Sequence, residues 1–418
     1  MSLLSGMFSA LEHRNYRMLW SGSMLATTAF MMSFLLIPSV AFEISGSNAA
    51  AGLAQMGSGI AMFTISPIGG VIADRMRKKP LVLAGQIVPA LVIITTGILI
   101  ITDLITVPML TGATLVMGLG FAFMGPARQA WVAELVPRDV FPNAVALQQI
   151  AQNISQVAAP LLIAVLVGNV LDIGATYLFM GSLFIIVLPI TIALPNTASP
   201  VREPRPIRSE LMAGLRYVWG DRRLRTLWLG FVGIVVCGFA FQTLLPGLLS
   251  EELDRSPTDI GVIFLTLALA GLLVNLVLAG MVRTGPAWGL LLATGIIMAF
   301  GFFLVAFAPT YWLVIAAGVP LGIGRSGFML VNNTLLMSTA EPAFHGRVMS
   351  LSMMGFGSQA LLAPVWGLVA DQLGVRTTLF IVGIATASVT AAIGVAWVGF
   401  RVRPSTTAES VPRFMTGD

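Results

Sequence analysis

Charged residues are scarce in this chain: Asp, Glu, Lys and Arg make up 10% of its 418 residues, while hydrophobic residues make up 57%. Soluble domains usually carry about 25% charged residues, because water has to solvate their surface. A chain so poor in charge cannot cover itself with groups that water solvates. This composition excludes an ordinary soluble domain and makes lipid the main solvent of the protein.

Cysteine and histidine are also nearly absent. The one cysteine, Cys237, excludes an internal disulfide framework and any cysteine pair that could hold a metal. It sits in an apolar run, which is typical of a buried thiol. The two histidines, His13 and His345, are too few for a His-rich metal site. We therefore expect no metal and no cofactor, and we find no constellation of a nucleophile and a base that would indicate an enzyme.

Long apolar segments are what the chain has instead. A helix crosses the hydrocarbon core of a bilayer in about 20 residues, and segments of that length recur twelve times in the sequence. They lie near residues 18–42, 49–73, 80–102, 106–127, 143–170, 174–194, 226–249, 260–282, 286–308, 311–337, 348–370 and 377–400. The even number predicts that both termini lie on the same side of the membrane.

Lys and Arg decide which side that is. With both termini inside, 20 of the 23 basic residues fall in inner segments, two (Arg255 and Arg376) fall in outer loops, and Arg325 falls within a span. Short cytoplasmic loops carry such an excess of basic residues. We predict a multi-pass protein of the cell (inner) membrane with cytoplasmic termini. The net charge of +5 follows from this topology, so no nucleic-acid partner is expected.

The two halves of the sequence resemble each other. Gly118 and Gly120 in the fourth segment match Gly322 and Gly324 in the tenth. Two related halves around a central site are typical of secondary transporters; a channel is the alternative, but channels more often form from several chains. We predict an all-α membrane protein of twelve transmembrane helices in two pseudo-symmetric six-helix halves, acting as a monomer. The parts are an N-terminal half (1–194), a cytoplasmic linker with an amphipathic helix (195–225), a C-terminal half (226–403) and a cytoplasmic tail (404–418).

A charged motif connects the second and third segments. It reads Gly69-Gly70-Val71-Ile72-Ala73-Asp74-Arg75-Met76-Arg77-Lys78-Lys79-Pro80. An acid at the C-terminal end of a helix is unfavourable beside the negative end of the helix dipole. Asp74 therefore needs a partner, which could be a cation or the positive N-terminal end of another helix. The alternative is a charged turn that only fixes topology.

This motif resembles the hallmark loop of the major facilitator superfamily, with Gly70, Asp74, Arg75, Lys78 and Lys79 at the matching positions. It departs from the family at Arg77, where glycine is usual. Further segments resemble one branch of that superfamily, the bacterial exporters similar to the enterobactin exporter. These segments are Glu12–Arg17, Phe42–Ser47, Gly125–Gln129, Glu134–Pro137 and Gly214–Trp219.

The resemblance implies the major facilitator fold and transport by alternating access, driven by an ion gradient, with protons as the coupling ion. It implies export of amphipathic organic compounds, either drugs or siderophore-like metabolites. The motif residues would form an inner conformational gate, with Arg128 nearby. The antiporter motif of the fifth span is reduced to Ala158-Ala159-Pro160, which weakens the case for antiport. Uptake of a substrate and lipid flipping are the alternatives on the same fold.

Arg325 is the first candidate for the substrate path. It lies 14 residues into its segment from Tyr311, which is about 20 Å at 1.5 Å per residue. A charge at that depth costs several kcal/mol unless it faces a cavity or a partner. We predict a role in the substrate path; a structural arginine bonded to carbonyl groups is the alternative.

Amides and soft apolar side chains complete the predicted path. Gln148, Gln152 and Gln156 share one face of the fifth segment, and such amides turn away from lipid toward a cavity or a neighbouring helix. Asn332 is a similar case in the tenth segment. Met31 and Phe121 suit an adaptable apolar pocket, with packing against lipid as the alternative. No carboxylate lies at mid-depth, so Glu43, at the outer end of the first segment, is the candidate for proton coupling.

Overall fold

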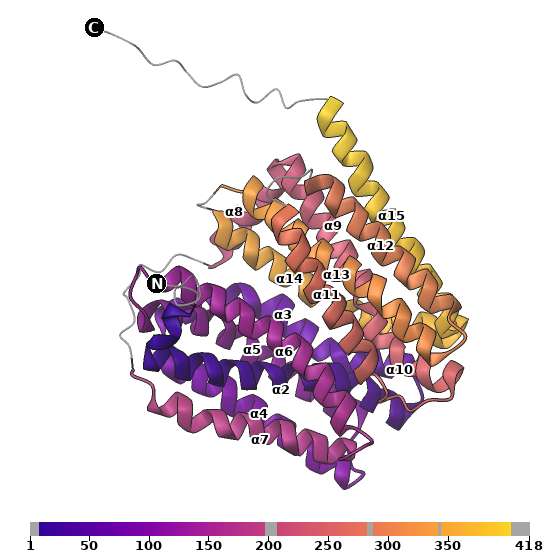
Figure 1. The fold of residues 1–418 in the computed structure, drawn as a ribbon, viewed down its shortest axis with the longest axis horizontal. Coiled ribbons are helices and arrows are strands. Elements are labelled where there is room, and N and C mark those ends of the chain that lie inside the picture. The colour runs from indigo at the N-terminus through magenta and orange to yellow at the C-terminus, as the bar shows by residue number, and fades with distance from the viewer. Residues whose placement is uncertain (1–7, 197–206, 282–286, 342–343, 403–418) are drawn as a thin grey trace.

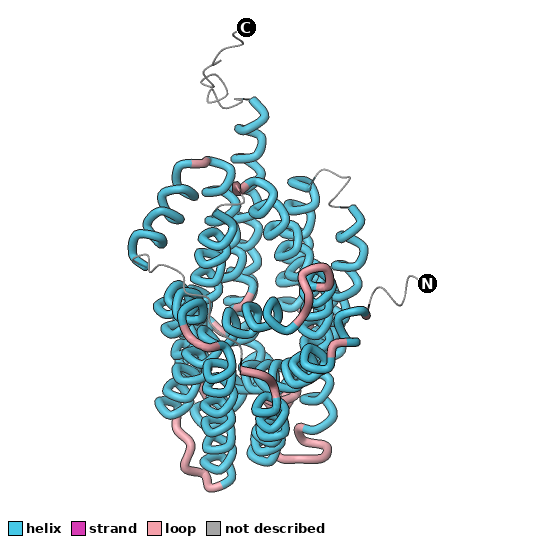
Figure 2. The backbone as a smooth tube through the Cα atoms, turned by 90° about the vertical axis from the view of Figure 1, so that its left-hand side faces the viewer, coloured by secondary structure: helices cyan, strands magenta, loops and turns pink. Residues whose placement is uncertain are grey.

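The computed structural model describes residues 8–196, 207–281, 287–341 and 344–402, and within these ranges the structure is helical apart from short connections and one isolated bridge between Val167 and Leu171 (Figure 2). For residues 66–75, 207–211, 279–280 and 400–402 the description covers the backbone alone. The prediction of an all-α membrane protein is confirmed. The predictions for residues 197–206 of the linker and for the tail after Arg403 concern positions outside the described residues.

The N-terminal half begins with a short 3-10 helix, η1 (Ser9–Glu12), and continues with six long helices. These are α2 (Arg14–Ser45), α3 (Asn48–Arg75), α4 (Lys78–Ile101), α5 (Val107–Leu135), α6 (Phe141–Leu166) and α7 (Ile173–Ala193). The linker contains α8 (Ile207–Gly220). The C-terminal half holds α9 (Arg222–Gly238), α10 (Ala240–Leu253), α11 (Gly261–Met281), α12 (Ala287–Phe307), α13 (Tyr311–Thr339), α14 (His345–Leu373) and α15 (Val375–Val402).

Each predicted span overlaps one of these helices, with α9 and α10 together forming the seventh. Eleven helical segments of the described chain are long and apolar enough to cross a membrane, by length and composition. The remaining predicted span coincides with α3, a helix of 28 residues. Following the predicted orientation, we use the name outer end for one end of the molecule. It carries residues 46–47, 102–106, 167–172, 254–260, 308–310 and 374.

Figure 1 shows the two halves as two bundles, α2–α7 in indigo to magenta and α9–α15 in pink to yellow. The matched glycines of the sequence repeat make equivalent contacts in the two bundles. A Cβ on Gly118 of α5 would lie 2.8 Å from the Ala61 Cβ of α3, and one on Gly322 of α13 would lie 2.9 Å from the Leu267 Cα of α11. The fourth span therefore packs against the second in the same way as the tenth span packs against the eighth. In both pairs glycine lets the two helices approach closely.

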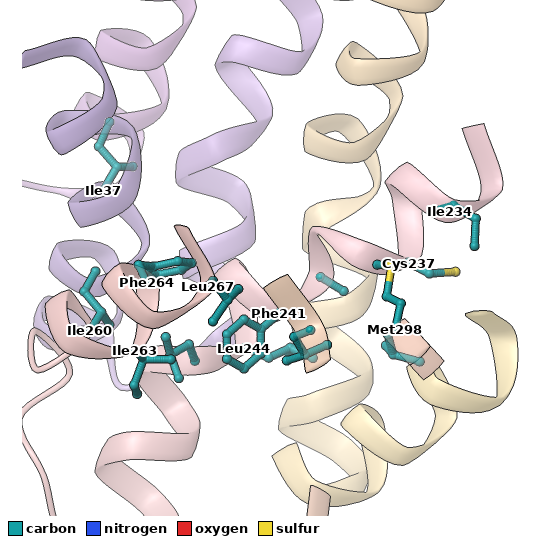
Figure 3. Packing of buried hydrophobic residues seen from close by; sticks show 14 of the residues in the cluster. Ile37, Ile234, Cys237, Phe241, Leu244, Ile260, Ile263, Phe264, Leu267 and Met298 are labelled. Carbon is teal, nitrogen blue, oxygen red and sulfur yellow. The ribbon is translucent and has the colours of Figure 1, made fainter. Parts of the chain in front are cut away.

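The seventh span is broken in its middle. The sequence predicts one continuous segment over 226–249, but α9 ends at Gly238 and α10 starts at Ala240, with Phe239 between them. Met298 of α12 fills the space beside Gly238, so that a Cβ there would collide with its terminal methyl group. Figure 3 shows this packing, including Cys237, which is buried as the sequence predicts.

The linker helix α8 docks on the C-terminal half. The Tyr217 ring stacks on the Phe344 ring with 3.9 Å between centroids, and the Tyr217 hydroxyl accepts a hydrogen bond from the Glu341 backbone N–H at 2.9 Å. Val218 is fully buried, while Trp219 is 44% exposed. The helix therefore has one face on the protein and one away from it; its amphipathic role at the membrane interface stays a prediction.

Candidate functional site

Arg325 lies in the middle of α13 and rests on an aromatic ring of the seventh span. Its Cζ atom is 3.7 Å from the centroid of the Phe239 ring. Phe239 meets the Phe356 ring edge to face at 6.0 Å, and Phe356 meets Phe231 in the same way at 5.3 Å. A guanidinium over an aromatic face is stabilised by the ring quadrupole, more so away from water. This contact joins α13 to the junction between α9 and α10.

In the part of the chain that the structure describes, no carboxylate lies at the depth of Arg325. In the described spanning helices the acidic residues all fall within the last four residues of their helix: Glu43 in α2, Asp74 in α3, Glu134 in α5, Glu251 and Glu252 in α10, and Asp371 in α14. Among the described residues Arg325 has neither an ion pair nor a side-chain hydrogen bond. Among the described residues no opposite charge pairs with the guanidinium, and the face of the Phe239 ring stabilises it instead.

The matching position in the N-terminal half carries an aromatic pair. Phe121, on α5, stacks on Phe30 of α2 with 4.7 Å between centroids and 15° between the planes, and Phe30 in turn faces Phe34 at 6.4 Å. The fourth span thus contacts the first through Phe121 and Phe30. The tenth span contacts the seventh in the corresponding place, through Arg325 and Phe239. Met31, beside Phe30, is half-buried against the apolar core.

The predicted amide residues take different environments. On α6, Gln148 and Gln152 are half-buried and Gln156 is exposed. Asn332 of α13 is 1% exposed, and neither its Oδ1 nor its Nδ2 atom has a hydrogen-bond partner. In this conformation Asn332 therefore lies in the packed interior. An unpaired buried amide costs about 1–3 kcal/mol, so this side chain lowers the stability of the conformation described here.

Most of the predicted gate residues lie at the end of α3 and at the start of α4. Gly70, Asp74 and Arg75 lie in the last two turns of α3, where the description covers the backbone alone. Lys79 donates from Nζ to the carbonyl oxygens of Ile192 and Leu194 at 2.6 and 2.7 Å. This places a cation at the negative end of α7, which is favourable.

The remaining predicted residues lie apart from one another. Lys78 is buried, and its Nζ donates to the Met76 carbonyl oxygen at 3.2 Å. Arg128 of α5 is half-buried and donates from Nη1 to the Thr27 hydroxyl of α2 at 3.3 Å. Glu43 is exposed at the outer end of α2. The roles of these residues in gating and proton coupling stay predictions.

A polar cluster at the outer end joins the halves and was not singled out by the sequence. Asp371, near the end of α14, accepts hydrogen bonds from the start of α3, and Asn48 of α3 donates from Nδ2 to Glu251 of α10 at 3.2 Å. Nearby, Arg376 pairs with Glu252 at 2.7 Å within the C-terminal half. Deeper in, Gln242 of α10 donates to the Phe34 carbonyl oxygen at 2.7 Å. The halves are thus closed on each other at the outer end.

Two pseudo-symmetric helical bundles, a charge at mid-depth and contacts between the halves at one end define a polytopic membrane transporter. The sequence profile of the Major Facilitator Superfamily matches residues 19–358 and 228–417, and the chain belongs to that family. The resemblance in the loop after α3 is thereby confirmed.

Similar proteins agree with this assignment. The chain is 23% identical to the macrolide efflux protein A of Streptococcus pyogenes over 372 residues, which cover 86% of this chain and 90% of that protein. It is 21% identical to the staphyloferrin A transporter of Staphylococcus aureus over 265 residues, 63% of this chain and 66% of that one. A solved bacterial homologue of the human lysosomal transporter Spinster, inward-facing and unoccupied, shares the fold with a TM-score of 0.74 at 13% identity, covering 94% of this chain and 99% of that chain.

Proposed function

We propose that this protein exports amphipathic organic compounds, either drugs or siderophore-like metabolites, by alternating access coupled to protons. The names of its relatives support this direction: one is a macrolide efflux protein and another a staphyloferrin A transporter. The substrate is a small molecule that enters the protein from the cytoplasm or the inner leaflet. The protein works as a monomer in the cell membrane, with both termini in the cytoplasm.

Arg325 is the single observation that carries the substrate chemistry. A half-buried guanidinium without a carboxylate partner among the described residues, stacked on Phe239, keeps donors that an anionic or acceptor-rich group of a ligand can use. The neighbouring rings Phe356 and Phe231 supply apolar area for the rest of an amphipathic molecule. Retaining such a charge at mid-depth costs several kcal/mol, and binding a ligand of opposite charge offsets that cost.

Phe121 and Met31 would contact the apolar part of the same ligand from the N-terminal half. Phe121 occupies the position of the repeat that matches Arg325, and it stacks on Phe30. Gln148, Gln152, Gln156 and Asn332 would add hydrogen bonds as the halves move. A ligand held between an aromatic pair on one side and a stacked arginine on the other would bridge both halves, as alternating access requires.

Glu43 is the proposed proton carrier, because it is the carboxylate at the end of the first span and matches a family position. A Glu43→Gln variant should export its substrate down a concentration gradient but lose accumulation against it. If Glu43→Gln still concentrates substrate under an imposed proton gradient, another group carries the proton or another ion drives transport.

The test of the function begins with binding and ends with direction. Purified protein is screened by thermal shift against drugs, siderophores, lipids and metabolites, and each compound that stabilises it is followed in cells that express the protein. Export predicts lower accumulation than in cells without it. Higher accumulation would establish uptake instead, and movement of a fluorescent lipid between leaflets without any effect on the soluble compounds would establish lipid flipping.

A further inference from the structure

One carboxylate from the C-terminal half caps a helix of the N-terminal half. Asp371 Oδ2 accepts hydrogen bonds from the Ser47 hydroxyl at 2.6 Å and from the Ala49 backbone N–H at 3.1 Å, and its Oδ1 accepts from the Asn48 backbone N–H at 2.8 Å. The first N–H groups of a helix have no partner within it, and a negative charge there meets the positive end of the dipole. A helix cap is usually local, whereas this one joins residues 323 positions apart.

The cap holds only while the two helix backbones are in contact. A Cβ on Gly367 of α14 would collide with the Asn48 carbonyl oxygen, and one on Gly52 of α3 would lie 2.6 Å from the Pro364 Cα. The approach continues to mid-depth, where a Cβ on Gly357 would lie 2.7 Å from the Phe63 backbone nitrogen. Separation of α3 from α14 at the outer end would therefore break every hydrogen bond of Asp371.

The sequence repeats the capping element at the opposite end of the same helix pair. Gly367-Leu368-Val369-Ala370-Asp371 ends α14, and Gly70-Val71-Ile72-Ala73-Asp74 ends α3. The contacts above run in opposite directions along the two helices, so α3 and α14 are antiparallel. Each Gly-x-x-Ala-Asp element is therefore at the C-terminal end of its own helix and at the level of the N-terminal end of the other.

We infer that Asp371 is a latch for the outer end. Asp371 caps α3 when the outer end is closed, which is the conformation described above, and it loses these hydrogen bonds when that end opens. The inference rests on the proposed alternating-access function. Because the cap exists in only one of the two conformations, the Asp371 carboxylate shifts the balance toward the one that is closed at the outer end.

Pulsed electron paramagnetic resonance on the full chain tests the latch. Spin labels are placed on cysteines at Thr102 and Thr377, exposed residues at the outer ends of the two halves, with Cys237→Ala as background. Asp371→Asn should raise the ratio of the long to the short distance by roughly two- to fivefold, since an exposed cap contributes modestly.

Asp172→Asn is the matched control. Asp172 also caps a helix at the outer end, accepting from the Ala175 N–H at 2.6 Å, but it joins no residues of different halves. It should leave the distances unchanged. Ser47→Ala removes one donor to Asp371 and should give the effect of Asp371→Asn in weaker form, which keeps the test readable if Asp371→Asn does not fold.

The latch is overturned if Asp371→Asn changes the distances no more than Asp172→Asn does. The readout needs no substrate. A distance shift in a protein that exports nothing would refute the proposed function and leave the latch standing, while export without any shift would refute the latch alone.

Discussion

The guanidinium of Arg325 lies over the Phe239 ring, 3.7 Å from its centroid, at the point where the seventh span breaks into α9 and α10. A charge at mid-depth is thereby tied to a discontinuity in the helix that packs beside it. A ligand that draws the guanidinium off the ring would change the packing of this junction. We therefore propose that substrate binding acts on the conformation at this contact.

The first prediction concerns the charge itself. Arg325→Lys keeps the charge but loses the planar fork that binds acceptors in pairs, and Arg325→Ala loses both. We expect affinity to fall in the order wild type, Lys, Ala, with the Ala variant losing about 1.5–3 kcal/mol of binding free energy, as for a hydrogen bond to a charged group. Titration of purified protein with a compound from the thermal-shift screen measures this.

Arg255→Ala is its control, because Arg255 makes a similar contact with the Tyr311 ring, 5.1 Å from the centroid, near the outer end. It should not alter affinity. An Arg325→Ala variant that binds as tightly as the wild type would show that the arginine is structural.

The second prediction concerns the inner gate. Asp74→Asn should slow transport far more than it weakens binding, because Asp74 is predicted to balance conformations rather than to contact the substrate. Transport rates in cells and affinities of purified protein give the comparison. Asp139→Asn, a change of an exposed acid in the next inner loop, should affect neither. Wild-type transport by Asp74→Asn would mean that the motif only fixes topology.

The third prediction concerns Asn332, whose buried amide has no hydrogen-bond partner. Asn332→Leu should raise thermal stability, since it removes an unpaired polar group worth about 1–3 kcal/mol, and it should reduce transport if the amide serves the substrate path in another conformation. Asn153→Leu, which removes an amide that accepts from Gln149 at 3.3 Å, should not stabilise. A less stable Asn332→Leu variant would indicate a partner for this amide.

The positions of the spans could be predicted because burial in lipid leaves a direct mark on composition. The ends could not, since helices run on past the apolar stretch: α2 starts at Arg14 rather than 18, and α5 reaches Leu135 rather than 127. The break at Phe239 was also missed. The residues around it are apolar on both sides, so hydropathy does not register the interruption of the helix.

Contacts between residues that are far apart in the sequence could not be predicted either. Arg325 could be recognised from its depth, but nothing near it in the sequence points to Phe239. Asp371 was overlooked because an acid at the end of a span resembles any loop residue. The repeated Gly-x-x-Ala-Asp element at residues 70–74 and 367–371 was the available signal, and its meaning depends on α3 and α14 being antiparallel neighbours.

The fourth prediction concerns orientation. Cysteines at Ser199 and Thr407, in a Cys237→Ala background, should resist membrane-impermeant reagents in intact cells and react after permeabilisation, because the basic residues gather on that side. A cysteine at Asn169, exposed in an outer loop, should react in intact cells. Labelling of Ser199→Cys or Thr407→Cys from outside would reverse the topology.

Proton-driven export is tested most directly in inside-out membrane vesicles. With a proton gradient imposed, acidic inside, vesicles with the wild-type protein should accumulate a compound that stabilises it in the thermal-shift screen. That accumulation should collapse when a protonophore is added, and it should be nearly absent in vesicles with Asp74→Asn. Accumulation that survives the protonophore would contradict proton coupling, and loss of preloaded compound from the same vesicles under the gradient would contradict export.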